Sequence, residues 1–442
     1  MLCVRINIKE SLATPRTRLL CLLAILALVA THGSPQSAND ESRIATVQSL
    51  VESGSLIIDK TAFLSTRDKV FINGHFYSDK PPMPSLIGAA VYLPLYHLGF
   101  GLHDKASVPY YLVTLLTVKL FWLLGSVAFF RALRFTGLDA EKRFLASVSL
   151  AFGSVYFTWS TTFNSHELAA AFLIIGFYFV LKARFGAAVN INLGIAAFFL
   201  SLAGTADIPT AVFYALFLAY VSRDARLRHG AVWYVLPLLV TAVPALAMTY
   251  AIHHSIVPVQ IVRSYFQYPG SPWINSDGLS GMEINSASFS FKYGLLVLVG
   301  PKGFLIYNPI LWIALWGLVR AIRRRGPFFD EAIVIGAGSI VLGLYYVLFT
   351  TNYSGWSYSI RWFVPALPLL FFFLYPYFQA YDERRARNFR VLLGAAVVIA
   401  LIGVVNPWSD ETLSEVPFIS NLKELSLYLG SHADCWRQGP CT

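Results

Sequence analysis

Long apolar runs are the feature of this sequence that most restricts its fold. Residues 110–130, 232–252 and 332–349 are each close to the roughly 20 apolar residues that cross a bilayer core as a helix. Of the 442 residues, 56% are hydrophobic and only 13% are charged, whereas a soluble domain carries about 25% charged residues. We therefore expect an all-α polytopic membrane protein, whose chain length reflects the number of transmembrane helices and not the number of soluble domains.

The net charge of +10 is explained by membrane topology and does not indicate a nucleic-acid partner. Most of the 34 lysine and arginine residues fall in six short segments between apolar runs. Short loops rich in lysine and arginine are typical of the cytoplasmic side. The six predicted cytoplasmic segments are 5–18, 131–143, 182–184, 223–228, 320–325 and 384–390.

This rule predicts about eleven transmembrane helices within one integral membrane domain, 1–442. Segment 84–100 is treated as a re-entrant or membrane-surface helix, because a full crossing there would place 131–143 outside. The large outer parts are then the loops 32–109 and 253–302 and the C-terminal tail 408–442. The predicted spans are 19–31, 110–130, 144–163, 167–181, 190–206, 208–222, 231–252, 303–319, 332–350, 362–379 and 391–406.

Both ends of the chain leave alternatives open. The basic leader and short apolar run at 19–31 fit either a cleavable signal peptide or an uncleaved first helix. We favour the uncleaved helix, because the polar segment after it needs an anchor. At the other end, Cys435 and Cys441 either close a small disulfide ring on an oxidising side or belong to a frayed tail.

The first outer loop is expected to be structured, with juxtamembrane helices. Apolar residues recur at helical spacing after residue 43, and Asn39 and Asp40 are suitable caps for such a helix. A turn at Asn73-Gly74 then predicts a pair of short extended segments. The apolar positions of the helix are Ile44, Val47, Leu50 and Val51.

Three polar clusters fall on the predicted outer face: residues 39–43, residues 79–82 and residues 164–167. An acid at the mouth of an apolar helix is costly unless it is paired, hydrated or bound to a ligand, so His166 and Glu167 are functional candidates. Simpler explanations are also open. Asp40 could only cap its helix, and His166 could only be a polar anchor at the interface.

Together the clusters resemble the GT-C glycosyltransferases, in particular the aminoarabinose transferase and protein O-mannosyltransferase class. The resemblance rests on an acidic pair at the head of a juxtamembrane helix, a Lys-Pro-Pro before a membrane-surface helix, and an acid at the outer end of a later span. It covers roughly residues 30–220. It implies inverting transfer of a sugar from a polyprenyl-phosphate donor to a lipid, glycan or protein acceptor, at the periplasmic face of a bacterial inner membrane.

The resemblance also implies roles for the acidic residues. Asp40 matches the catalytic acid and is assigned as general base, with Glu41 supporting it or sharing a metal. His166 and Glu167 occupy the place of a second acid. They are expected either to orient the acceptor or to hold a divalent ion between Asp40 and Glu167; no other cofactor is expected.

Three basic residues are candidates for binding the donor phosphate. Lys80 precedes two prolines, which fix the backbone and hold the ammonium at the membrane edge. Arg361 lies at the outer end of a predicted span, where a guanidinium can grip phosphate with two hydrogen bonds. Lys302 is a third candidate, although a lysine reaching from a helix end to the interface is an equally good explanation.

The main alternative is a non-enzymatic transporter or lipid flippase. Such a protein needs charges deep in the spans, and the sequence offers Lys119 and Asp207. No internal repeat is found, which disfavours a transporter built from inverted halves. A membrane scaffold is a third alternative, but the clustered outer acids would have no purpose in it.

Overall fold

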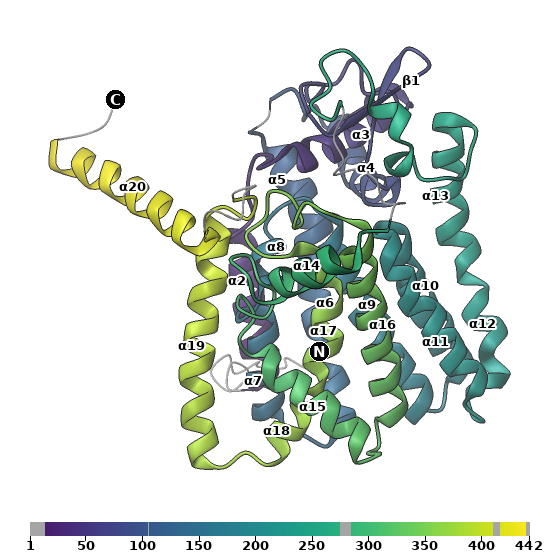
Figure 1. Ribbon diagram of the computed structural model, residues 1–442, viewed down its shortest axis with the longest axis vertical. Helices are drawn as coiled ribbons and strands as arrows, with labels where there is room; N and C mark the ends of the chain where they lie inside the picture. Colours follow the sequence, from purple (N-terminus) through teal and green to yellow (C-terminus); the bar gives the residue numbers. More distant parts are fainter. Residues whose placement is uncertain (1–13, 105, 275–283, 410–415, 439–442) are drawn as a thin grey trace, which may run out of the picture.

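A computed structural model describes residues 14–104, 106–274, 284–409 and 416–438 (Figure 1). Seven helical segments within these ranges are long and apolar enough to cross a membrane. Two shorter apolar helical segments accompany them, Ile208–Arg223 and Ala287–Val299. The all-α membrane fold is thus confirmed, while the number of eleven spans stays a prediction. The seven long segments are Val108–Thr136, Ser165–Phe185, Val189–Ala206, Arg228–His253, Phe329–Phe349, Arg361–Gln379 and Glu383–Val405.

Several of these segments combine α-helix with short 3₁₀ or π turns. The first half of the described chain contains α2 (Pro15–Val29), α3 (Ala38–Ser53), α4 (Pro82–His97), α5 (Val108–Thr114), η1 (Leu115–Lys119), α6 (Leu120–Ala132), η2 (Leu133–Thr136), α7 (Ala140–Ala151), α8 (Val155–Trp159), α9 (Ser165–Phe185), α10 (Val189–Ala206), η3 (Ile208–Thr210) and α11 (Ala211–Arg223). The second half contains η4 (Arg228–Gly230), α12 (Ala231–Val235), α13 (Pro237–His253), η5 (Val259–Ile261), η6 (Arg263–Phe266), α14 (Ala287–Val299), α15 (Leu311–Arg323), α16 (Phe329–Phe349), η8 (Arg361–Ala366), α17 (Leu367–Phe371), η9 (Phe372–Leu374), α18 (Tyr375–Gln379), α19 (Glu383–Val405) and α20 (Pro417–Gln438).

The span expected at 144–163 is not one continuous helix. It is divided into α7 and α8 at Gly153-Ser154. The Ser154 hydroxyl caps α8, and the side-chain carbonyl of Asn308 accepts the Val155 N–H at 2.9 Å. The break is therefore made by polar side chains that replace the lost helical hydrogen bonds, one of them from a residue far along the chain.

One end of the bundle carries α3, α4 and a two-stranded hairpin, which together we call the α3 assembly (Figure 1). Strand β1 (Lys69–Ile72) pairs antiparallel with β2 (His75–Ser78). Asn73 and Gly74 join them at φ of 51° and 87°, the left-handed backbone of a tight hairpin turn. The predicted helix and turn of the first outer loop are both present.

Helix α4 begins directly after the Lys80-Pro81 step and packs along α3. At the contact, a β-carbon built on Gly88 would lie 2.9 Å from Cγ2 of Val47, so only glycine lets the two helices approach this closely. Segment 84–100 thus lies beside α3 at this end of the bundle (Figure 1). Whether it enters the bilayer or rests on its surface stays a prediction.

The basic loops meet at the opposite end of the bundle. Arg18 pairs with Glu141, joining the start of α2 to that of α7, and Arg184 pairs with Glu331, joining the end of α9 to the start of α16. Arg226 donates to the Gly186 carbonyl there. The structure therefore separates the basic loops from the α3 assembly, as the charge pattern requires.

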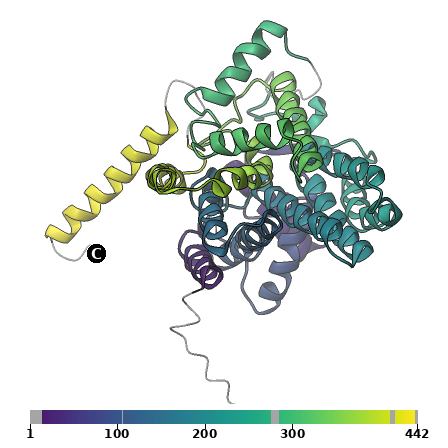
Figure 2. The same ribbon diagram turned by 90° about the horizontal axis from the view of Figure 1, so that it is seen from below.

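Two predicted outer segments contain helices that the sequence analysis did not predict. The loop 253–302 includes the apolar helix α14, and the tail 408–442 includes α20, which leaves the bundle in both views (Figures 1 and 2). The disulfide predicted between Cys435 and Cys441 falls on side chains outside the described part of the chain.

Candidate active site

Asp40 lies in the first turn of α3 and is fully buried. The helix is capped by Ser37, whose hydroxyl accepts the Asp40 N–H, so neither Asn39 nor Asp40 is the N-cap. One carboxylate oxygen of Asp40, Oδ2, accepts the Gln36 N–H at 3.0 Å. Oδ1 is buried without a hydrogen-bond partner among the described residues. The Gln36 N–H therefore occupies one oxygen, while the other is buried without a partner in the described part of the chain.

The surroundings of Asp40 suit a base that works near neutral pH. Burial raises the pKa of Asp40 to about 7, while the Gln36 N–H, the Arg43 and Arg361 charges and the Trp408 indole act in the opposite direction. A carboxyl with a pKa near ambient pH can accept a proton and later release it.

Arg43 lies one turn after Asp40 and ties α3 to the bundle. Its Nη2 donates to the Ser165 hydroxyl at 2.9 Å, and its Nη1 donates to the backbone and side-chain carbonyls of Asn39. Only 2% of Arg43 is exposed. The guanidinium thus places the first turn of α3 against the first turn of α9.

Lys80 is held by two carboxylates. Its ammonium lies 2.8 Å from Oδ2 of Asp68 and 2.9 Å from Oδ2 of Asp79. Burial raises the pKa of Asp79, with a further rise from the Asp68 charge. Burial also acts on Asp68, but the charges of Lys80, Arg361 and Arg43 outweigh it and lower its pKa. Asp68 is therefore the ionised carboxylate that balances three cations.

Arg361, at the start of η8, faces the same cluster. Its guanidinium carbon lies 4.7 Å from the centre of the Trp408 ring, and its Nη1 donates to the Trp356 carbonyl at 2.9 Å. The Asp68 and Asp40 charges act on it. The charges of two predicted residues from distant parts of the sequence, buried Asp40 and half-buried Arg361, therefore act on each other in one cluster.

Lys302 is fully buried and supports the loop that carries Arg361. Its ammonium donates to the Gly355 carbonyl at 3.0 Å, and its own carbonyl accepts the Ser359 hydroxyl at 3.3 Å. The structure thus shows Lys302 holding the backbone on both sides of this loop. A direct phosphate contact by Lys302 stays a prediction.

His166 points toward a partner that the sequence prediction did not name. Its Nδ1 lies 2.8 Å from Oδ2 of Asp207, which follows the last residue of α10. Asp207 also acts on Tyr346, whose ring stacks on Trp362 at 4.5 Å with an interplanar angle of 3°. An aspartate thus orients one ring nitrogen of His166 beside the Arg43 and Arg361 charges.

Glu167, the other residue predicted at the place of a second acid, faces a different set of charges from His166. Successive helix residues point about 100° apart, so the two side chains face different directions. Glu167 is fully buried inside the bundle, and both its carboxylate oxygens lack a hydrogen-bond partner in the described ranges. The charge that acts on it is Lys119, whose ammonium donates to Ser160 at 2.7 Å.

A divalent ion between Asp40 and Glu167 does not fit this arrangement. The charges around Asp40 come from Arg43 and Arg361, and the charge facing Glu167 comes from Lys119. Within the described residues, no group of three His, Cys, Asp or Glu side chains is placed to hold a metal.

Glu41 is half-buried in the same turn as Asp40, and its charge acts on Tyr110.

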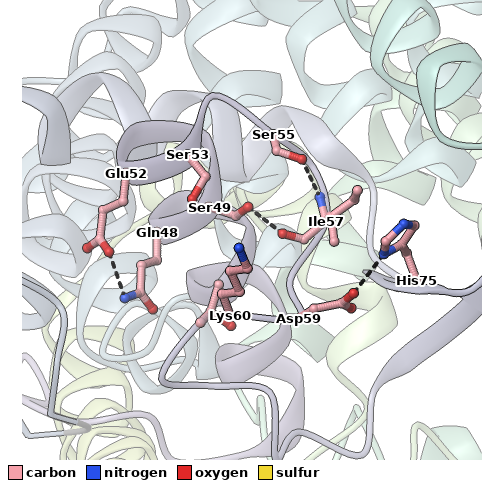
Figure 3. Close-up of a pocket in the computed structure, with 10 residues that line it drawn as sticks. Gln48, Ser49, Glu52, Ser53, Ser55, Ile57, Asp59, Lys60 and His75 are labelled. Atoms are coloured by element: carbon pink, nitrogen blue, oxygen red, sulfur yellow. Dashed lines mark hydrogen bonds and ion pairs between the residues drawn. The ribbon is translucent and has the colours of Figure 1, made fainter.

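A separate pocket of about 270 Å³ lies on the α3 assembly, along the C-terminal half of α3 (Figure 3). Gln48 donates to Glu52 at 3.0 Å, and His75 pairs with Asp59 at 2.8 Å. Its lining includes no residue predicted from the sequence as part of the site. The Asp40 cluster and this pocket therefore use opposite halves of one helix.

The sequence analysis gave no role in this site to Arg43, Asp68 or Asp207, although Arg43 was part of the polar cluster 39–43 and Asp207 was considered as a transporter charge. Arg43 had a usable signal, because it follows Asp40 by three residues and so shares its helix face. Asp68 precedes a strand and Asp207 ends a helix, where a lone aspartate has no distinguishing pattern. Only the packing of α3, the hairpin and α10 brings them to the site.

Two solved structures are similar to this chain over most of its length. ArnT from Cupriavidus metallidurans bound to undecaprenyl phosphate matches with a TM-score of 0.57 at 16% identity, covering 88% of this chain and 69% of that one. ArnT from the same organism in the apo state matches with a TM-score of 0.54 at 16% identity and the same coverage. No family model matches the sequence, nor does any curated protein. The likeness shows that the chain shares the polytopic membrane fold of these ArnT structures.

Proposed function

We propose that the protein is a glycosyltransferase that moves a sugar from a polyprenyl-phosphate carrier to an acceptor, at the membrane face on which the α3 assembly lies. The observation that carries this proposal is the buried Asp40, with a pKa of about 7, near Arg43 and Arg361, whose charges also act on Asp68 of the Lys80–Asp68 pair. Asp40 can act as the base, and the neighbouring cations can neutralise the charge of a phosphate group. The GT-C fold shared with an ArnT structure bound to undecaprenyl phosphate supports the choice of donor.

In this mechanism Oδ1 of Asp40 takes the proton from an acceptor hydroxyl or amine. The acceptor atom attacks the anomeric carbon while the bond from that carbon to the phosphate oxygen breaks. Polyprenyl phosphate leaves with the bonding electrons, and a single displacement inverts the anomeric centre. Acid–base help of this kind typically contributes about 10² to 10⁴ in rate.

The cations serve the leaving phosphate. Arg361 and Lys80 neutralise charge that grows on the phosphate as the glycosidic bond breaks, and a buried setting strengthens their effect. Arg43 fixes α3 against α9 through Ser165 and keeps Asp40 at the same place. His166, oriented by Asp207, offers its second ring nitrogen to the sugar or the acceptor. No metal enters these steps.

The α3 end is assigned to the outer side, which we take to be the periplasm of a bacterial cell. This orientation rests on the basic loops at the opposite end of the bundle. A polyprenyl carrier in the bilayer would then present its phosphate at the level where the spans meet the α3 assembly.

A lipid flippase is the second candidate, and one observation favours it. Lys119 and Glu167 place two charges inside the bundle, where a transported headgroup would need polar contacts. A flippase moves lipid without changing covalent structure, so it predicts an unchanged inventory of glycan masses.

The test is a mass comparison of envelope lipids and glycans from cells that carry the wild type, Asp40→Asn or Asp59→Asn at matched membrane levels. Asp59 is the control, because it lies in the α3 assembly and pairs with His75 away from the cluster. We expect one sugar modification to disappear in Asp40→Asn alone. An unchanged inventory in Asp40→Asn, in a strain where deletion does alter the envelope, would favour the flippase.

A further inference from the structure

Helix α20 leaves the bundle at a level fixed by the end of α19. The buried side-chain amide of Asn421 donates to the carbonyls of Ile402 at 3.0 Å and Asn406 at 2.9 Å. The Phe418 N–H adds a bond to the Tyr307 hydroxyl at 3.1 Å. Since α19 is one of the long apolar segments, α20 starts at the height where that segment ends.

The rest of α20 extends away from the bundle in both views (Figures 1 and 2). Phe418, Leu422, Leu425 and Leu429 recur at helical spacing and form one stripe. Leu422 is 46% exposed and Leu429 is 58% exposed. Lys423 and Ser426, which are also exposed, lie off this stripe. The helix thus presents a leucine stripe beside polar positions such as Lys423 and Ser426, although exposed Ile419 and Leu427 lie off the stripe.

We propose that α20 lies on the membrane surface at the α3 end, with its leucine stripe in the boundary between headgroups and acyl chains. Amphipathic helices take this position, burying their apolar face a few ångströms deep. Exposed Val398 and Leu401 near the end of α19 form an apolar surface close to the root of α20. The bilayer that surrounds α19 is already present at the level of α20, so lipid can cover the leucine stripe without any additional protein.

This placement has a consequence for the cluster around Asp40. Asn406 is bound by α20 through both Asn421 and Glu424, and Trp408 follows two residues later. Trp408 lies over the Arg361 guanidinium. A helix held on the leaflet therefore steadies the segment that brings Trp408 to the site.

Spin labels on the full-length protein test the proposal without depending on activity. The four native cysteines are replaced by serine, and single cysteines are introduced as Leu422→Cys, Leu429→Cys, Lys423→Cys and Ser426→Cys. Each labelled protein is placed in phosphatidylethanolamine–phosphatidylglycerol nanodiscs that hold one copy. Collision rates are then measured with oxygen, which concentrates in lipid, and with a water-soluble nickel chelate.

We expect a severalfold higher oxygen-to-nickel ratio at 422 and 429 than at the matched polar positions 423 and 426. Four labels that all favour the nickel chelate would place α20 in water and overturn the proposal. In discs that hold two copies, spin–spin broadening confined to 422 and 429 would identify a second copy of the chain as the occupant and would also overturn it.

Discussion

At the scale of single residues, Asp40 has two functions: it makes a local hydrogen bond at the start of α3, and it is the base of the proposed reaction. Oδ2 accepts the Gln36 N–H near the start of α3, and Oδ1 is buried beside the arginines. A capping aspartate at an exposed helix end would keep an acidic pKa. Burial raises the pKa of Asp40, and this raised pKa has consequences for activity and for stability.

The first prediction concerns pH. Because Asp40 must be ionised to take a proton and its pKa is about 7, kcat/KM should fall about tenfold per pH unit below neutrality. The same raised pKa means that the folded state holds this proton more tightly than the unfolded chain. The contribution of Asp40 to stability should therefore decline as pH rises from about 4 to about 7. A kcat/KM profile that stays flat from about pH 5 to 8 would contradict its assignment as base.

The second prediction concerns Asp68, the carboxylate that balances Lys80, Arg361 and Arg43. An incoming phosphate competes with it for the same cations. Asp68→Asn should therefore bind polyprenyl phosphate about tenfold more tightly, a gain of about 1.4 kcal/mol. Isothermal titration with undecaprenyl phosphate measures this, with Asp59→Asn as the matched control. Weaker binding in Asp68→Asn would show that Asp68 positions Lys80 and does not compete with the ligand.

Single residues also show where sequence reasoning was limited. Asp40 was assigned from the family resemblance, and Lys80 and Arg361 as phosphate-binding cations; the Arg361 charge acts on Asp40 and on Asp68, the partner of Lys80. Glu167 was assigned with His166 from their shared place at the mouth of a span, which does not determine which way each side chain points. The true partner of His166 is Asp207, 41 residues away, and no local pattern links the two.

At the scale of elements, α9 joins the proposed site to the interior of the bundle. Its first turn binds Arg43 through Ser165 and Asp207 through His166. One residue later, Glu167 turns inward toward Lys119, which ends the π-helical turn η1. Lys119 thus lies in a π-helical turn, a rare element that is frequent at functional sites.

The third prediction tests this internal pair. Lys119 and Glu167, both in the described part of the chain, act on each other through their charges without a direct ion pair, so Lys119→Met and Glu167→Gln should each lower stability by less than the roughly 3 kcal/mol lost when a directly paired buried ion loses its partner. The double variant should recover much of that loss, because no lone charge remains. Thermal unfolding of the two single variants and the double variant in detergent provides the comparison. Additive losses would show that the two side chains do not interact.

Element boundaries were predictable where the signal is local. The hairpin turn follows from Asn73-Gly74, and the amphipathic α3 follows from its apolar spacing. The break between α7 and α8 was not predictable, because Asn308 completes it from another part of the chain. The tail did carry a signal for α20, the helical spacing of Phe418, Leu422, Leu425 and Leu429, which the sequence analysis did not use.

At the scale of the whole molecule, the charge pattern predicted the arrangement better than it predicted individual spans. The basic loops meet at one end through Arg18–Glu141 and Arg184–Glu331, far from the α3 assembly. This separation results from many weak preferences acting together, so errors in single helix boundaries hardly affect it.

The fourth prediction is the orientation in the membrane. In a cysteine-free background, Lys60→Cys on the α3 assembly should react with an impermeant thiol reagent in spheroplasts. Arg134→Cys at the basic end should react only after permeabilisation, because short basic loops stay in the cytoplasm. Labelling of Arg134→Cys in intact spheroplasts would reverse the topology and remove the proposed site from the outer face.

The most direct test of the central claim is turnover by the purified protein in proteoliposomes supplied with envelope extract from a deletion strain. Mass spectrometry follows loss of the polyprenyl-phosphate sugar, release of polyprenyl phosphate and gain of one sugar mass on an acceptor. We predict that the wild type produces all three changes together. Asp40→Asn should slow them by about 10² to 10⁴ while still binding undecaprenyl phosphate. Equal rates in Asp40→Asn and the wild type, or no sugar transfer by a wild type that binds the carrier, would contradict the account.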